Sequence, residues 1–367
     1  MTPLPTPDPI PLPAAVWLLS SMLALTFTLH VVPMNLLLGG SIVAVISRIR
    51  GRKDARAAAL AREIAGAMPV LFAATITLGV AALLFMQTLY GRAFFSAAVL
   101  LSVPWFLVVV ALIVGYCTAY AARAAGAASR LAGPGALVVS ISVASVAFVQ
   151  ANVMSATLHP DWLPAWFAAG ANGLRLNLGD PTLLPRFLHV AAGACAVAGA
   201  GVAIAGYLRR TREAEQSAWM IRQGALWFVV ATVVNVAFGV WWLAALPLQT
   251  MLLFMGRDVA GTIWLVAGIL ASLAAFGHMI PVIMARDPRS LLFGGTGSLA
   301  VTMVCMVMVR DTARRAELAA AGMPPATWVR PQWGAILVFL VLLLSAVALV
   351  WWMVSAWRSA PAARRSS

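Results

Sequence analysis

Three of the four histidines in this chain lie inside long apolar segments. His30 is in FTLHVVPMNLLLGG, His189 in RFLHVAAG and His278 in AAFGHMIPVIM. A neutral imidazole in an apolar segment costs free energy unless it has a partner. Imidazole binds haem iron well, and a haem between the helices of a bundle would supply that partner. The alternative is a packed histidine that is bonded to a backbone carbonyl of a neighbouring helix.

The elements that carry these histidines are predicted to be membrane helices. Of the 367 residues, 62% are hydrophobic and only 10% are charged, which is too few charges to cover a soluble surface. Apolar runs of about 20 residues predict transmembrane helices. We therefore predict an all-α polytopic membrane protein with about nine helices, at roughly 15–47, 66–90, 95–123, 133–157, 184–208, 223–246, 259–284, 290–309 and 333–357.

These helices are expected to form one domain, residues 15–357. An extended outer tail, residues 1–14, precedes it, and a basic cytoplasmic tail, residues 358–367, follows. Most of the lysines and arginines fall on one side of the predicted spans, so the positive-inside rule places the N-terminus outside and the C-terminus inside. The net charge of +14 is then a topology signal, which argues against nucleic-acid binding. We expect a multi-pass protein of the bacterial inner membrane.

Carboxylates are predicted to be absent from the interiors of the spans. All eleven fall in loops, in tails or at the ends of spans, and this argues against proton-driven transport. The three cysteines are isolated, and no C-x-x-C-H motif attaches a haem covalently. Histidine therefore remains the main candidate for chemistry inside the membrane.

Several segments resemble subunit I of the cytochrome bd-type quinol oxidases. RFLHVAAG is similar to that family's basic-Phe-aliphatic-His opening of the fifth helix, and His30 with Gly39 is similar to its first-helix His and Gly. FAATITLGVAALLFMQTLYG and, more weakly, SVASVAFVQANVMSATLHP resemble its second and fourth helices. The resemblance implies that His189 is an axial ligand of a low-spin b haem and that His30 serves a second haem site.

The chain also departs from that family. Gln87 replaces a glutamate, the last predicted span contains no Glu, and the loop that the family uses for quinol shrinks to LPLQTMLLFMGRD. We therefore expect a divergent member that oxidises quinol and passes electrons through one or two b haems to an outer acceptor. That acceptor would be a periplasmic c-type cytochrome or another redox subunit. The alternatives are a terminal quinol oxidase that reduces oxygen and a haem-free structural membrane subunit.

The remaining site candidates follow from depth in the membrane. His189 lies near the outer face, His30 near the middle and His278 near the inner face, so pairing of His30 with His278 is easier than pairing of His189 with His278. The candidate sixth ligands are Met86, Met154, Met251 and Met255, with Met279 beside His278. Haem propionates or a partner would meet Arg186 and an outer loop with Arg310, Arg314 and Arg315. The quinol-contact candidates are Gln87, Gln150, Asn152 and Trp162.

Overall fold

The computed structural model describes residues 7–8, 10–125, 132–170, 172–285, 287–326 and 328–359. Within these ranges the regular structure is helical, apart from one isolated bridge between Leu12 and Val329. The helices in chain order are α1 Val16–Arg50, α2 Ala55–Leu100, α3 Ser102–Ala125, α4 Ala132–Leu158, α5 Leu163–Ala168, α6 Leu183–Arg209, α7 Ala214–Ala245, α8 Leu248–Leu252, η1 Leu253–Arg257, α9 Val259–Val282, α10 Arg289–Ala320 and α11 Trp333–Ser359.

The chain is an all-α polytopic membrane protein, as predicted. Over the described residues, eight helices are long and apolar enough to cross a bilayer: α1, α2, α3, α4, α6, α7, α9 and α10. The ninth predicted span corresponds to α11, whose described apolar stretch is the shorter segment Trp333–Ser345. Its role as a ninth span stays a prediction.

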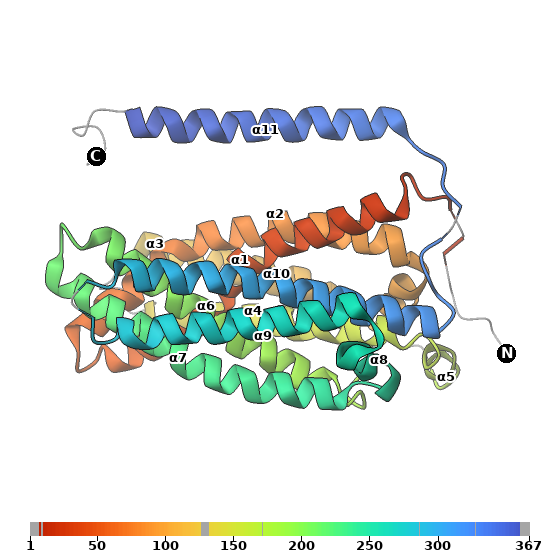
Figure 1. Cartoon of the computed structure of the whole chain (residues 1–367), viewed down its shortest axis with the longest axis horizontal. Coiled ribbons are helices and arrows are strands. Elements are labelled where there is room, and N and C mark those ends of the chain that lie inside the picture. Colours follow the sequence, from red (N-terminus) through yellow and green to blue (C-terminus); the bar gives the residue numbers. More distant parts are fainter. Residues whose placement is uncertain are drawn as a thin grey trace.

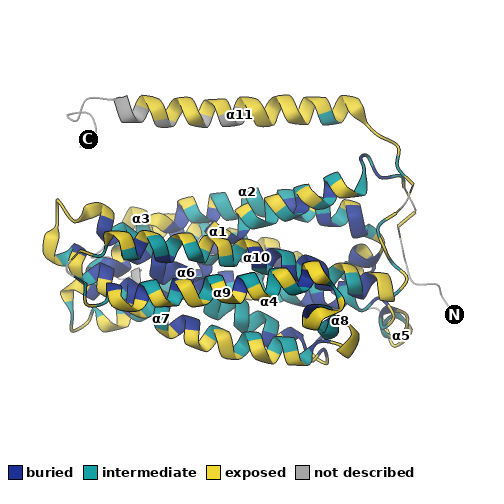
Figure 2. Cartoon of the chain, in the orientation of Figure 1, coloured by how far each residue is buried: buried dark blue, intermediate teal, exposed yellow. Residues whose placement is uncertain are grey.

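The long helices lie side by side along the length of the molecule, and α1 begins at the opposite end of the bundle from the end of α11 (Figure 1). Two ends can be named. The α5 end contains α5, α8 and the start of α1, and the basic end contains the α1–α2 and α6–α7 turns. Buried residues lie between the helices, whereas outward faces and nearly all of α11 are exposed (Figure 2). Such an apolar exposed surface suits lipid.

Close approach of backbones sets the positions of the histidine-bearing helices. A Cβ atom on Gly39 of α1 would lie 2.0 Å from the carbonyl oxygen of Ala194 in α6. A Cβ atom on Gly224 of α7 would lie 2.4 Å from the backbone nitrogen of Ala203 in α6. Small residues let membrane helices pack this tightly. The backbone of α6 is therefore held closely against α1 and against α7.

Several predicted boundaries were wrong. The helix α2 has 46 residues and runs to Leu100, with a backbone break at Tyr90, so residues 95–100 belong to α2 and the third span begins at Ser102. At about 1.5 Å per residue, α2 is roughly 69 Å long, more than twice the hydrocarbon core. The helix α10 continues to Ala320 instead of ending at residue 309. Short helices, α5 and α8, fill predicted loops.

The predicted tails are described only in part. Residues 7, 8 and 10–14 of the N-terminal tail are described, and the backbone nitrogen of Leu12 donates to the carbonyl oxygen of Trp328 at 2.9 Å. The tail therefore pairs with the segment that leads into α11. At the other terminus α11 runs to Ser359, and the rest of the predicted basic tail, residues 360–367, lies outside the described residues.

Candidate functional site

The imidazole of His30 is held between α1 and α2. Its Nδ1 lies 3.0 Å from the carbonyl oxygen of Thr75. A carbonyl can only accept, so Nδ1 carries the proton and Nε2 keeps its lone pair. One turn beyond Thr75, a Cβ on Gly79 would lie 2.7 Å from Cε1 of His30. The glycine therefore makes room for the ring, and Nε2 is left available as a metal ligand.

The imidazole of His189 is held in the same way between α6 and α7. Its Nδ1 lies 3.0 Å from the carbonyl oxygen of Asn235. Four residues later, a Cβ on Gly239 would lie 3.0 Å from Cε1 of His189. The two hairpins thus share one local arrangement: an imidazole, a carbonyl on the facing helix, and a glycine one turn further on. The sequence contains no obvious repeat from which the similarity of the two hairpins could be predicted.

Both sites contain buried polar atoms that have no hydrogen-bond partner among the described residues. These are Oγ1 of Thr75, whose carbonyl binds His30, Oδ1 of Asn235, whose carbonyl binds His189, and Nε1 of Trp242, three residues after Gly239 in α7. Buried polar groups are normally satisfied by protein, ordered water or a bound group. Thr75 and Asn235 also supply the carbonyls that hold the two imidazoles. A bound group beside each histidine would therefore be within reach of these unsatisfied atoms.

His278 differs from the other two membrane histidines. Its Nδ1 lies 2.7 Å from the carbonyl oxygen of Ala274, one turn earlier in the same helix, α9. A Cβ on Gly294 of α10 would lie 2.6 Å from its Cδ2 atom. The described contacts do not join His278 to His30 or His189. The predicted role of His278 as a haem ligand is untested and has no supporting contact, so the function proposed below is built on His30 and His189 alone.

The four candidate arginines lie in helices, so the predicted outer loop for three of them was wrong. Arg314 and Arg315 of α10 both bind the buried carboxylate of Asp311, with Nε of Arg315 3.0 Å from Oδ2. Because about one helical turn separates Asp311 from each arginine, the helix itself brings these groups together. Arg314 and Arg315 therefore share one carboxylate of their own helix, which offsets part of their charge.

Arg310 and Arg186 remain for an anion from outside the chain. Arg310 has its guanidinium 4.5 Å from the ring centroid of Phe27 and lies within electrostatic reach of His30 and Arg186. No described carboxylate forms an ion pair with Arg310. Arg186 donates to Oγ1 of Thr182 at 3.0 Å. It also lies within electrostatic reach of two carboxylates, in Asp180 and Glu317.

The methionine candidates are not brought to the histidines by any described contact. Met86 is buried in the core cluster around Tyr90 and Phe94, and Met154 packs against the same cluster. Met251 packs against Phe254, while Met255 is 54% exposed. Met279 is fully buried beside His278. The sixth iron ligand therefore stays a prediction, and the exposure of Met255 argues against it.

The four quinol-contact candidates divide into two kinds. Asn152 is fully buried and already bonded: its Nδ2 donates to the carbonyl of Phe148 at 3.0 Å, and its Oδ1 accepts from the backbone nitrogen of Asn177 at 3.0 Å. This amide is better explained as a tie between α4 and the loop before α6. Trp162 stacks on His159, with ring centroids 3.9 Å apart. Gln87 and Gln150 are half-buried on α2 and α4.

Sequence reasoning missed a buried polar network at the α5 end. Oδ2 of Asp180 accepts from the hydroxyls of Ser155 and, at 2.9 Å, of Thr182. Nδ2 of Asn177 donates to Ser155 Oγ at 2.7 Å, and Nε2 of His159 lies 3.7 Å from Asp180 Oδ2. The only signal was Asp180 shortly before the start of α6, a position typical of helix-capping carboxylates.

His159 lies outside the spanning helices, so its ionisation can be assessed. Burial lowers the pKa of the His159 imidazole, the carboxylates of Asp180 and Asp161 oppose this, and Arg186 adds to the lowering. The net direction is downward. His159 is therefore neutral at neutral pH and protonates only on acidification.

Comparison with known proteins gives no family for this chain. No protein-family model matches it, and no curated protein is significantly similar to it. The functional argument therefore depends on the residues and their geometry.

Proposed function

We propose that this chain is a membrane-embedded b-type cytochrome that oxidises quinol and passes the electrons through haem b to an acceptor at the α5 end. We also propose that the chain is a divergent relative of cytochrome bd subunit I, which its sequence resembles. It would lie in a bacterial inner membrane with its N-terminus outside. The observation that carries it is the matched pair of imidazoles, His30 and His189. Each directs its Nδ1 proton to a carbonyl and leaves Nε2 without a described partner.

The residues at these two positions fit a haem. Iron-ligating histidines commonly donate their second ring proton to a carbonyl, which fixes the tautomer and the ring orientation. Gly79 and Gly239 leave the space that the imidazoles fill. Arg310, unpaired and near His30, supplies a charge that suits a propionate. A bound haem would supply one-electron transfer between the quinol and the acceptor.

The chain's own residues would orient and insulate that group. The carbonyls of Thr75 and Asn235 fix the two rings, and the helices of each hairpin, α1 with α2 and α6 with α7, would shield the rings from water. Gln87, Gln150 and Trp162 are the candidates that remain for the quinol ring. The two protons of the quinol would leave to the aqueous phase at the α5 end. A c-type cytochrome or another redox subunit would take the electrons there.

A haem-free structural subunit is the second candidate, and one observation favours it. The hydrogen bonds of His30 and His189 already tie two pairs of helices together, which is a sufficient structural role for each ring. Oxygen reduction has less support, because Gln87 stands where the resembled family has a carboxylate.

Reduced-minus-oxidised spectra with haem quantification separate these candidates. The purified protein should show a b-type alpha band, and His189→Ala and His30→Ala should each lower the haem content. His278→Ala is the matched control, because its ring is bonded within its own helix, and we expect it to keep the haem. Wild-type protein without haem would refute the cytochrome and leave the structural subunit. Oxygen uptake with quinol by the haem-loaded protein would instead select the terminal oxidase.

A further inference from the structure

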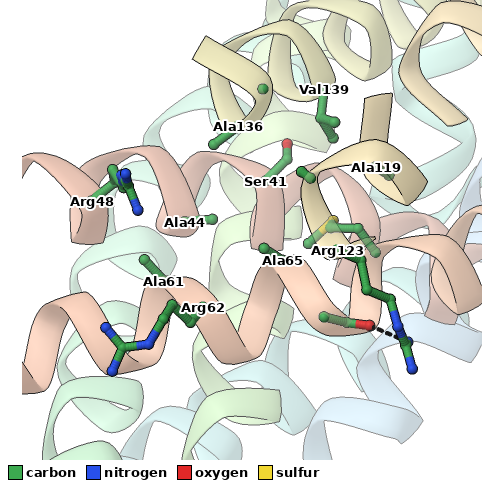
Figure 3. A pocket seen from close by; sticks show the side chains of 14 residues that line it. Ser41, Ala44, Arg48, Ala61, Arg62, Ala65, Ala119, Arg123, Ala136 and Val139 are labelled. Carbon is green, nitrogen blue, oxygen red and sulfur yellow. Dashed lines mark hydrogen bonds between the residues drawn. The ribbon is translucent and has the colours of Figure 1, made fainter. Parts of the chain in front are cut away.

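A cavity of about 130 Å³ lies between α1, α2, α3 and α4 near the basic end, and its lining does not include His30 or His189. Eight of its fourteen lining residues are alanine or glycine, and their small side chains leave the space open. In Figure 3, Ala44 on α1 and Ala61 and Ala65 on α2 line one part of it, and Ala136 and Val139 on α4 another. Such a volume holds a few waters or one small polar group, on the order of a phosphate.

Three arginines from three different helices line this cavity. They are Arg48 of α1, Arg62 of α2 and Arg123 of α3 (Figure 3). Arg48 is half-buried, while Arg62 and Arg123 are exposed. Nη1 of Arg123 donates to the carbonyl oxygen of Gly66 at 2.7 Å, which fixes the guanidinium at the cavity wall.

None of the fourteen lining residues is acidic. Other arginines at the same end do have carboxylate partners: Arg56 lies 3.7 Å from Asp54 and 3.8 Å from Glu215, and Arg209 binds Glu63. Among the described residues, Arg48, Arg62 and Arg123 form no ion pair. Glu63 lies within electrostatic reach of Arg62 but forms its ion pair with Arg209, so the described residues offset the positive charge of the cavity only in part.

We propose that this cavity binds a phosphate group, supplied by the headgroup of an anionic membrane lipid. Arginine donates to phosphate through paired N–H groups, and basic pockets between membrane helices bind such headgroups. The adjoining surface suits the acyl chains. Val70 on α2 is 66% exposed, and Ile113 and Val110 on α3 are 58% and 53% exposed. A lipid would thus meet charge at the cavity and apolar side chains beside it.

Lipid binding to the purified full chain in detergent tests this proposal. The probes are phosphatidylglycerol, phosphatidylcholine and inorganic phosphate, read by native mass spectrometry and by the thermal unfolding midpoint. The variant R48Q/R62Q/R123Q is compared with R50Q/R52Q/R212Q, which removes three exposed arginines of the same end that do not line the cavity. We expect phosphatidylglycerol to bind wild type and control equally and the cavity variant at least tenfold more weakly.

A second variant keeps the charges and fills the space. Ala136→Leu should also weaken phosphatidylglycerol binding at least tenfold, while the unfolding midpoint without lipid stays near that of wild type. Equal lipid retention by the cavity variant and the control would overturn the proposal, as would full retention by Ala136→Leu. Stabilisation by inorganic phosphate without any by phosphatidylglycerol would keep the phosphate site and overturn the lipid as its source.

Discussion

The α1–α2 and α6–α7 hairpins hold their histidines in the same way but surround them with different charge. His30 has the unpaired Arg310 nearby, whereas among the described residues no charged side chain is in electrostatic reach of the ring of His189. Arg186 lies one turn before His189 in α6, yet it also interacts with Arg310. The local frame around an imidazole is thus repeated, while the electrostatic setting is specific to each site. If a haem binds as proposed, Arg310 is therefore placed to meet a propionate of the haem at His30.

The α9–α10 hairpin sharpens the contrast further. His278 also faces a glycine, Gly294, but its Nδ1 is bonded inside its own helix. A glycine beside a histidine is therefore not enough to define the repeated site. The bond to a carbonyl of the facing helix is what separates His30 and His189 from His278.

The largest effect is expected from filling the space that the two glycines leave. Gly79→Leu and Gly239→Leu each place a side chain where a Cβ already falls within 2.7 Å or 3.0 Å of the imidazole. We expect loss of the haem signal that depends on that histidine, and a destabilisation of about 1–3 kcal/mol from overpacking. Haem quantification on the monodisperse protein measures the first, and thermal unfolding the second.

Gly297→Leu is the matched control, because a Cβ at that helical position meets no atom within 4 Å. The Gly297→Leu protein should keep the haem content of the wild type. If both Gly79→Leu and Gly239→Leu retain full haem, the two imidazoles are packing residues and the hairpins are matched for structural reasons alone.

A smaller effect should come from the charge that distinguishes the two sites. Arg310→Gln removes a cation near His30 and should lower the haem midpoint potential by several tens of millivolts, where about 59 mV is a tenfold change for one electron. The reason is that a nearby positive charge favours the reduced form. Arg315→Gln should change the potential little, because Arg315 is exposed and pairs with Asp311. Potentiometric titration measures both, and equal shifts would remove the assignment of Arg310 to His30.

The smallest effect should be a pH dependence of the unfolding free energy that comes from His159 at the α5 end. Because the folded pKa of His159 is lowered, the unfolded chain binds the proton more tightly. Stability is therefore complete above the ordinary histidine pKa of about 6.5 and falls as the pH drops from there toward the folded value. Thermal unfolding measured at several pH values across this interval should show a smaller loss of stability on acidification in His159→Phe than in wild type.

His278→Gln serves as the comparison for that experiment, since His278 has no described contact with a carboxylate. It should keep the wild-type pH dependence. A His159→Phe protein that loses stability as steeply as wild type would assign the acid sensitivity to other groups.

The sequence by itself determined the class of fold and most of its helices. An apolar run long enough to cross a bilayer is expected to be helical, because its backbone groups must form their hydrogen bonds within the segment when lipid surrounds them. The same logic singled out His30, His189 and His278, since an imidazole in an apolar run is unusual whatever the neighbours are. Boundaries were harder, and the helices α2 and α10 continue through segments whose polar residues resembled loops.

Only the tertiary structure decided which groups meet. Nothing local marks Thr75 and Asn235 as the residues whose carbonyls accept from the two imidazoles, because every residue carries a carbonyl and the choice depends on how the helices pack. The pairing of Arg314 and Arg315 with Asp311, which leaves Arg310 unpaired, required knowing that α10 continues past residue 309. Composition fixes which segments enter the membrane, but the contacts between segments distant in sequence decide which side chains can act together there.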